Sequence, residues 1–137
     1  MSFVLDTDTC SAYLRANRVV ANRFLQHTGG LYISTVTLCE LETWAGRKAS
    51  SPRVRITLDA MLDEVGIIPF DSDIAVECGR LRAEMFDRGA VVAIADLMIA
   101  ATAIRYGFNV VTHNIRHFSV VPNLHCVDWL APSGSQS

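Results

Sequence analysis

The chain has 137 residues, half of them hydrophobic, so it can bury a substantial core without disulfides or metals. It lacks a signal peptide and an apolar stretch of transmembrane length, so we expect a cytoplasmic protein with no membrane partner, whose four scattered cysteines are reduced thiols in or near the core. Its net charge of −2 excludes a strongly basic nucleic-acid-binding surface over the whole molecule.

The first predicted element is a short strand. The apolar run 3–5 is typical of a strand buried on both faces, and it stops at Asp6, an acid with no routine structural role there beyond a turn. Asp8 is suited to cap the helix that follows over residues 10–14, and residues 19–27 form a second helical stretch.

The next strand is followed by a helix that carries two acids. Residues 31–33 form the strand, which ends at Ser34, and the apolar spacing predicts a helix over residues 36–46. Glu40 and Glu42 lie on different sides of this helix, so only one of them can face the end of the sheet.

The middle of the chain repeats this alternation. Residues 47–52 are polar and indicate a loop, and a helix follows over residues 54–62. A short strand is predicted within residues 65–70, and Asp71 is placed to cap a long amphipathic helix over residues 74–88.

The last third contains the most apolar helix. Residues 95–106 are almost wholly apolar and must be buried, with Asp96 in the first turn. A strand over residues 109–112 ends in polar residues, and a last strand is expected around residues 125–128. The polar tail, residues 132–137, is expected to be disordered.

Strands and helices alternate throughout the chain. We therefore predict one α/β domain over residues 1–131, a three-layer α/β/α arrangement around a mostly parallel central sheet of four or five strands.

In this layout, polar residues collect at one edge of the sheet. Asp6, Ser34 and Asn114 follow apolar strands, Glu40 lies on a helix that leaves the same edge, and Asp96 starts the most buried helix. Converging carboxylates repel one another unless a cation binds between them. Oxygen ligands without His or Cys favour Mg²⁺ or Mn²⁺, and such a site suits phosphodiester hydrolysis.

Structural interpretations of these acids remain open at this point. Residues 37–40 fit a capping box that would use Glu40 to close its helix, and Asp96 could be an ordinary first-turn acid. His113 and His117 have a ligand-like spacing but no third partner, so we interpret them as loop or surface residues.

The charge balance permits an RNA partner. Without Asp6, Asp8, Glu40 and Asp96, ten acids remain against twelve bases, and all of the bases except Lys48 are arginines, which suit phosphate contacts. The candidates for sequence-independent phosphate binding are Arg15, Arg47, Arg53 and Arg116.

Four short motifs follow one another over nearly the whole chain: Leu5-Asp6-Thr7-Asp8, Ser34-x5-Glu40-Leu41, Ala95-Asp96-Leu97-x-Ile99-Ala100-Ala101-Thr102-Ala103 and Val111-Thr112-x-Asn114-x3-Phe118. In this order they resemble the motifs of PIN-domain ribonucleases, and most closely those of the VapC toxins of bacterial toxin–antitoxin pairs. The resemblance implies an α/β/α endoribonuclease that uses Mg²⁺ or Mn²⁺, inhibits translation, binds a cognate antitoxin protein and forms a homodimer.

Carried over by position, Asp6 and Asp96 match the principal metal ligands, and Glu40 would help to hold metal or position water. Asn114 stands where many PIN domains have a fourth acid, and Asp8 stands in place of a frequent Asn and would partly restore that charge. Thr7, Ser34 and Thr112 would be hydroxyl supports around the catalytic residues.

Other functions remain as alternatives. A haloacid-dehalogenase-like phosphatase, which Asp6-Thr7-Asp8 resembles, requires a downstream lysine, and Lys48 lies too early in a polar loop. A housekeeping PIN-domain nuclease that processes RNA, and a catalytically weak binding module, are the remaining alternatives, the latter because of Asn114.

Overall fold

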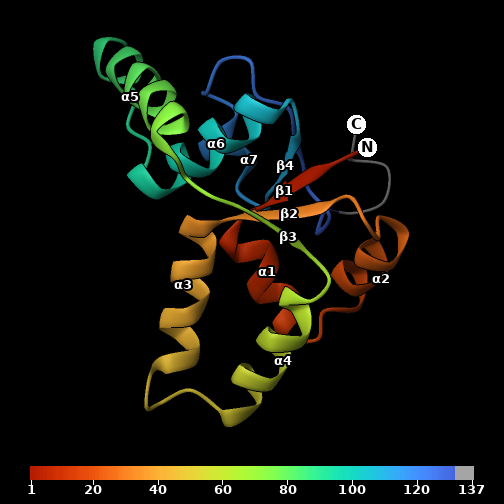
Figure 1. Cartoon of the computed structure of the whole chain (residues 1–137). Helices are drawn as coiled ribbons and strands as arrows, with labels where there is room; N and C mark the ends of the chain where they lie inside the picture. Colours follow the sequence, from red (N-terminus) through yellow and green to blue (C-terminus); the bar gives the residue numbers. More distant parts are fainter. Residues whose placement is uncertain (132–137) are drawn as a thin grey trace.

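A computed structural model describes residues 1–131, which form a parallel sheet covered by helices on both faces (Figure 1). The strands are β1 (Phe3–Leu5), β2 (Leu31–Ser34), β3 (Gly66–Ile68), β4 (Asn109–Val111) and β5 (Cys126–Val127). The helices are α1 (Thr7–Leu14), α2 (Arg18–Gln26), α3 (Thr35–Gly46), α4 (Pro52–Leu62), α5 (Ser72–Asp87), α6 (Ile94–Tyr106) and α7 (Ile115–Phe118). The sheet order β3-β2-β1-β4-β5 places β1 at the centre. The predicted α/β/α architecture with a parallel sheet is confirmed.

The alternation of side chains along β1 divides the core into two layers. Phe3 and Leu5 pack into a cluster shared with α1, α2, α3 and α4, whereas Val4 faces a cluster shared with α5, α6 and α7. Successive residues of a strand point to opposite faces, and all three are buried, which explains why the run is continuously apolar. The two helical layers lie on either side of the sheet in Figure 1.

The predicted burial of the apolar helix is confirmed. Within α6, Leu97, Ile99, Ala100, Ala101 and Ala103 are each at most 1% exposed. The helix packs on α5 on one side and on β1 and β4 on the other, so its alanines let three elements approach closely.

Several predicted boundaries shift. Pro52, expected in a loop, is the first residue of α4, where its missing amide hydrogen costs nothing because Ser51 caps the helix. The last strand shortens to two residues, and α7 was not predicted because four residues carry no helical periodicity. The predicted tail, residues 132–137, lies outside the described residues.

Two other expectations can be compared with the structure. Cys10 and Cys78 are buried and Cys126 is partly buried, but Cys39 is exposed, so placing it in or near the core was wrong. Within residues 1–131, no helix is long and apolar enough to cross a membrane.

The packing of α6 predicts a large difference between two identical substitutions. Ala100→Leu adds three carbon atoms to a fully buried position and should lower the free energy of unfolding by about 1–3 kcal/mol. The matched control is Ala83→Leu on the exposed face of α5, which should change it by less than about 0.5 kcal/mol. Urea unfolding of both variants measures the difference, and equal effects would contradict this account of the core.

Candidate active site

The carboxyl ends of three neighbouring strands bring polar residues to one edge of the sheet. Val4 pairs with Val110 and Leu5 with Val111 in the parallel register of β1 and β4, and β2 lies on the other side of β1. The residues at these ends are Asp6, Ser34 and Thr112, which are 3%, 0% and 0% exposed. We call this set of strand ends the acidic edge, together with the first turns of α1 and α6, the first half of α3 through Glu40, and Asn114 at the start of α7.

Asp6 is the buried carboxylate of the acidic edge. Its Oδ1 accepts a hydrogen bond of 2.8 Å from the backbone amide of Thr9, which makes it the N-cap of α1. The expectation that Asp8 caps this helix was wrong, as was the view that Asp6 has no routine structural role. Asp6 has both a capping role and an unusual burial. Burial raises the pKa of Asp6, and the hydrogen bonds from Thr112 and Thr9 oppose that rise only in part.

Glu40 is hydrogen-bonded to Thr7, the residue that follows Asp6. The Thr7 hydroxyl donates a hydrogen bond of 2.5 Å to Oε1 of Glu40, which fixes the start of α1 against the middle of α3. The capping-box interpretation of Glu40 was wrong because Ser34 caps α3 by accepting the amide of Val36 at 3.1 Å. Glu42 points to the other side of the helix and pairs with Arg55, as its position in the helix predicted.

Asp96 shares its surroundings with two other acids. It lies in the first turn of α6, and burial is the main reason that its pKa is raised. The charges of Glu40 and Asp8 raise that pKa further. His117 opposes the rise, since its Nδ1 lies 3.7 Å from Oδ2 of Asp96. His117 is exposed, as expected of a surface residue, but its approach to Asp96 was not predicted.

Asn114 and Asp8 form the exposed side of the acidic edge. The Asn114 side-chain amide donates a hydrogen bond of 2.9 Å to Oδ2 of Asp8, and its backbone amide donates one to Oγ1 of Thr112. Asn114 therefore orients Asp8 over the end of β4. His113 contacts Asp128 at 3.0 Å and takes no part in this arrangement.

The carboxylates of the acidic edge suit a divalent cation that keeps several of its waters better than one surrounded by protein ligands. Within residues 1–131, no three His, Cys, Asp or Glu side chains stand close enough together to hold a metal ion. None of the Lys or Arg ion pairs in this part of the chain uses Asp6, Asp8, Glu40 or Asp96. Mg²⁺ commonly binds through one or two carboxylates and keeps several waters. The uncompensated acids therefore fit such an ion, with Asp6 and Asp96 as the most buried candidates for its ligands.

One of the four arginines proposed from the sequence lies near the acidic edge, and the other three lie away from it. Arg116 lies on α7, directly after Asn114 and Ile115. Arg15 ends α1 and Arg47 ends α3, at the opposite ends of these helices from the acidic edge, and Arg53 lies in the first turn of α4, the next helix along the chain.

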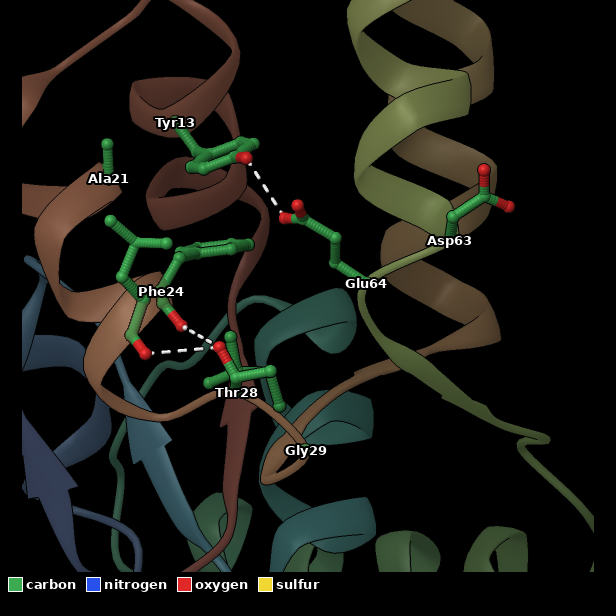
Figure 2. A pocket seen from close by; sticks show the side chains of 9 residues that line it. Tyr13, Ala21, Phe24, Thr28, Gly29, Asp63 and Glu64 are labelled. Carbon is green, nitrogen blue, oxygen red and sulfur yellow. Dashed lines mark hydrogen bonds between the residues drawn. The ribbon is translucent and has the colours of Figure 1, made fainter.

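Two hollows differ in their relation to the acidic edge. A recess of about 430 Å³ borders it and is lined by Thr35, Val36, Cys39, Glu40, Phe70, Ala95 and Met98. A cavity of about 510 Å³ lies between α1, α2 and the end of α4, with Tyr13, Phe24 and Glu64 in its wall (Figure 2). None of the candidate acids lines this second cavity, and in it the Tyr13 hydroxyl and Glu64 are 3.0 Å apart.

Comparisons with known proteins agree with this geometry. The family model described as "PIN domain" matches residues 3–124. The chain is 31% identical to a tRNA(fMet)-specific endonuclease VapC of Salmonella typhimurium and 32% identical to one of Shigella flexneri, covering 94% of this chain and 98% of each relative. A crystal structure of DNA-bound VapBC from Salmonella typhimurium superposes with a TM-score of 0.89 at 31% identity, over 94% of this chain and 98% of that one. VapBC2 from Rickettsia felis, bound to a promoter DNA fragment, gives 0.87 at 27% identity, over 94% and 99%.

The burial of Asp6 predicts a gain in stability when its charge is removed. A carboxyl group whose folded pKa is raised binds its proton more readily in the folded state, so stability falls as pH rises through that pKa and stays lower at pH 7. Asp6→Asn keeps the oxygen that accepts the Thr9 amide and should raise the free energy of unfolding at neutral pH in EDTA. The advantage should shrink on acidification to about pH 4.

The matched control is Asp71→Asn, which changes an exposed Asp that caps α5 through the amide of Ile74. Because this carboxylate is exposed, its replacement should change the free energy of unfolding at pH 7 by less than the replacement of Asp6. Urea unfolding at several pH values compares the two variants, and a loss of stability for Asp6→Asn at pH 7 would contradict the role given to burial.

Proposed function

The chain belongs to the PIN-domain family, in its VapC ribonuclease group, and we propose that it hydrolyses RNA at the acidic edge as the toxin of a toxin–antitoxin pair. The observation that carries this proposal is the set of uncompensated carboxylates at one end of the sheet, where burial and mutual repulsion raise the pKa values of Asp6 and Asp96. All of them lie within the segment that matches the PIN-domain model.

We assign Asp6 and Asp96 as the principal ligands of Mg²⁺ or Mn²⁺. When bound, such an ion lowers the pKa of its water and neutralises charge on the phosphoryl group. Asp6 is held in place by Thr9 and Thr112, and Asp96 by His117, so neither carboxylate has to be ordered when RNA binds.

Glu40 either completes the metal site or positions the attacking water. It is exposed and held by the Thr7 hydroxyl, so its carboxylate is oriented without being desolvated. An exposed carboxylate oxygen held in this way can accept a hydrogen bond from water. Ser34 and Thr112 act indirectly. Their hydroxyl oxygens accept hydrogen bonds from the backbone amides of Val36 and Asn114, which fixes the start of α3 and the turn that carries Asn114.

Arg116 is the arginine we assign to the phosphate next to the scissile bond. It is exposed on α7, and Asn114, at the start of that helix, contacts Asp8. A guanidinium group can form two parallel hydrogen bonds to a phosphate, and its contribution to binding weakens as salt rises.

The biological partner in this proposal is an antitoxin protein. The structural relatives described above are VapBC complexes, and both of those complexes contain DNA. We propose that this chain acts in the cytoplasm, forms a homodimer and inhibits translation until a cognate antitoxin binds it. A small neighbouring gene for a DNA-binding antitoxin would separate a toxin from a housekeeping nuclease.

The first prediction is that RNA cleavage requires both a divalent metal and the two principal acids. Asp6→Asn and Asp96→Asn should each lower kcat/KM by at least about 100-fold, because a bound metal contributes several kcal/mol to the transition state. EDTA should abolish cleavage, and added Mg²⁺ or Mn²⁺ should restore it.

The control for this experiment is Asp87→Asn at the end of α5, which removes the same charge from an exposed position outside the acidic edge. It should leave kcat/KM within about twofold. Unchanged cleavage in either acidic-edge variant would sink the residue assignment, and activity that ignores EDTA would favour the binding-module alternative.

The second prediction concerns the substrate, which we propose to be the initiator tRNA because two relatives above 30% identity are tRNA(fMet)-specific endonucleases. Purified protein with Mg²⁺ should cleave an initiator tRNA transcript at least about tenfold faster than an elongator methionine tRNA, a difference of about 1.4 kcal/mol. Mapping the 5′ ends of the products measures this preference. Equal rates on the two tRNAs would contradict the substrate while leaving the nuclease assignment intact.

A further inference from the structure

Two helices lead from the acidic edge to a group of cations on the far side of the α1–α4 layer. Helix α1 begins beside Asp6 and α3 begins after Ser34, and the hydrogen bond from Thr7 to Glu40 joins the start of α1 to the middle of α3. Near their far ends they are in contact again, since the guanidinium carbon of Arg15 lies 5.1 Å from the centre of the Trp44 ring. The two helices therefore run side by side away from the acids.

The far ends of these helices carry a local excess of positive charge. We call Arg15, Arg47, Lys48 and Arg53 the distal cationic cluster. No acid occurs between residues 43 and 58, and the acids on either side of that interval, Glu42 and Asp59, are both paired with Arg55. Within residues 1–131, none of the four cations of the cluster takes part in an ion pair with an acid.

The loop that carries the cluster is fixed by hydrogen bonds. Ser50 donates one from its hydroxyl to the carbonyl of Trp44 and one from its amide to the carbonyl of Arg47. The Ser51 hydroxyl accepts the amide of Arg53 at 3.2 Å and caps α4, whose N-terminal end adds positive potential of its own. The segment 47–53, which carries three of the four cations, lies at the tip where α3 leads into α4 (Figure 1).

The separation between the acidic edge and the cluster sets the kind of ligand. The 12 residues of α3 span about 18 Å at 1.5 Å per residue between the strand end at Ser34 and Arg47, and Glu40 in the middle of the helix is about 10 Å from Arg47, so one phosphate beside Asp6 does not also reach the cluster. We propose that the distal cationic cluster is a second RNA-binding surface, which holds the phosphate backbone of a folded RNA several nucleotides from the bond at the acidic edge. This inference rests on the proposed ribonuclease function.

Such a surface explains how a chain of net charge −2 can hold RNA. Acids at the edge repel phosphates unless a cation is bound there, so attraction to the polyanion has to come from another surface. Four cations without acidic partners provide it, and they act on the backbone rather than on bases. The cluster therefore contributes affinity and orientation, and the acidic edge contributes the chemistry.

Binding of a labelled tRNA transcript in EDTA tests the proposal without any cleavage. The triple variant R47Q/K48Q/R53Q should bind about 10- to 100-fold more weakly at low salt, and the slope of log affinity against log salt should fall by about 2, since each lost phosphate contact contributes about 0.7–0.9. The conservative variant R47K/R53K keeps the charge and should stay within about threefold of the unaltered protein. Fluorescence anisotropy over a salt series measures all of these values.

The control triple variant, R80Q/R82Q/R88Q on α5, removes the same charge from another exposed surface and should leave affinity and slope nearly unchanged. An equal loss in both triple variants would reduce the effect to net charge and overturn the proposal. Unchanged RNA binding with weakened binding of the purified cognate antitoxin would assign the cluster to a protein partner instead, which also overturns it. EDTA suppresses metal-dependent cleavage, so the binding measurement does not depend on catalysis. Failure to hydrolyse RNA in the presence of metal would refute the nuclease assignment but would leave the measured affinities unchanged.

Discussion

The acidic edge depends on one buried carboxylate. Asp6 ends the central strand, caps α1 through the Thr9 amide and accepts a hydrogen bond from Thr112, which follows the neighbouring strand. One side chain thus connects β1, α1 and β4 at the point where the chemistry is placed. Those hydrogen bonds also offset part of the cost of burying a charge, since an ionised carboxylate without partners at 3% exposure would be strongly destabilising. The fold therefore provides a site where negative charge is oriented but not neutralised.

The rest of the acidic edge extends this arrangement with partners that leave its net charge in place. A neutral hydroxyl holds Glu40 and a neutral amide holds Asp8, while the imidazole of His117 approaches Asp96. A lysine or arginine in any of these positions would neutralise an acid and lower its affinity for a cation. Apart from Arg116, the cations that we assign to RNA binding lie in the distal cationic cluster, where they would not pair with the acids of the edge. Under the proposed function, this separation of charge along α1 and α3 would let one small domain bind both a cation and a polyanion.

The sequence predicts the architecture well because most of the strands are short apolar runs that stop at a polar residue, whereas β3 stops at Pro69. The run at residues 3–5 and the helix over residues 95–106 carry the pattern that burial on both sides requires, and both are confirmed. Contacts between distant residues were not predictable in the same way. The hydrogen bond from Thr7 to Glu40 and the approach of His117 to Asp96 depend on how α1, α3, α6 and α7 pack, and no local pattern encodes that packing. The cap of α1 was misassigned because Asp6 and Asp8 are both suited to the role, and only the end of β1 decides between them.

The pairing of Asn114 with Asp8 bears on how many negative charges the acidic edge holds. A neutral amide at position 114 removes a carboxylate from the end of β4, where many PIN domains have a fourth acid. That amide donates a hydrogen bond of 2.9 Å to Asp8, which brings a carboxylate from α1 to the same place, and the charge of Asp8 raises the pKa values of both Asp6 and Asp96. We infer that the fourth charge is relocated from β4 to α1 and not lost. Asn114 then acts as a positioning residue for Asp8, which adds a fourth carboxylate to the acidic edge.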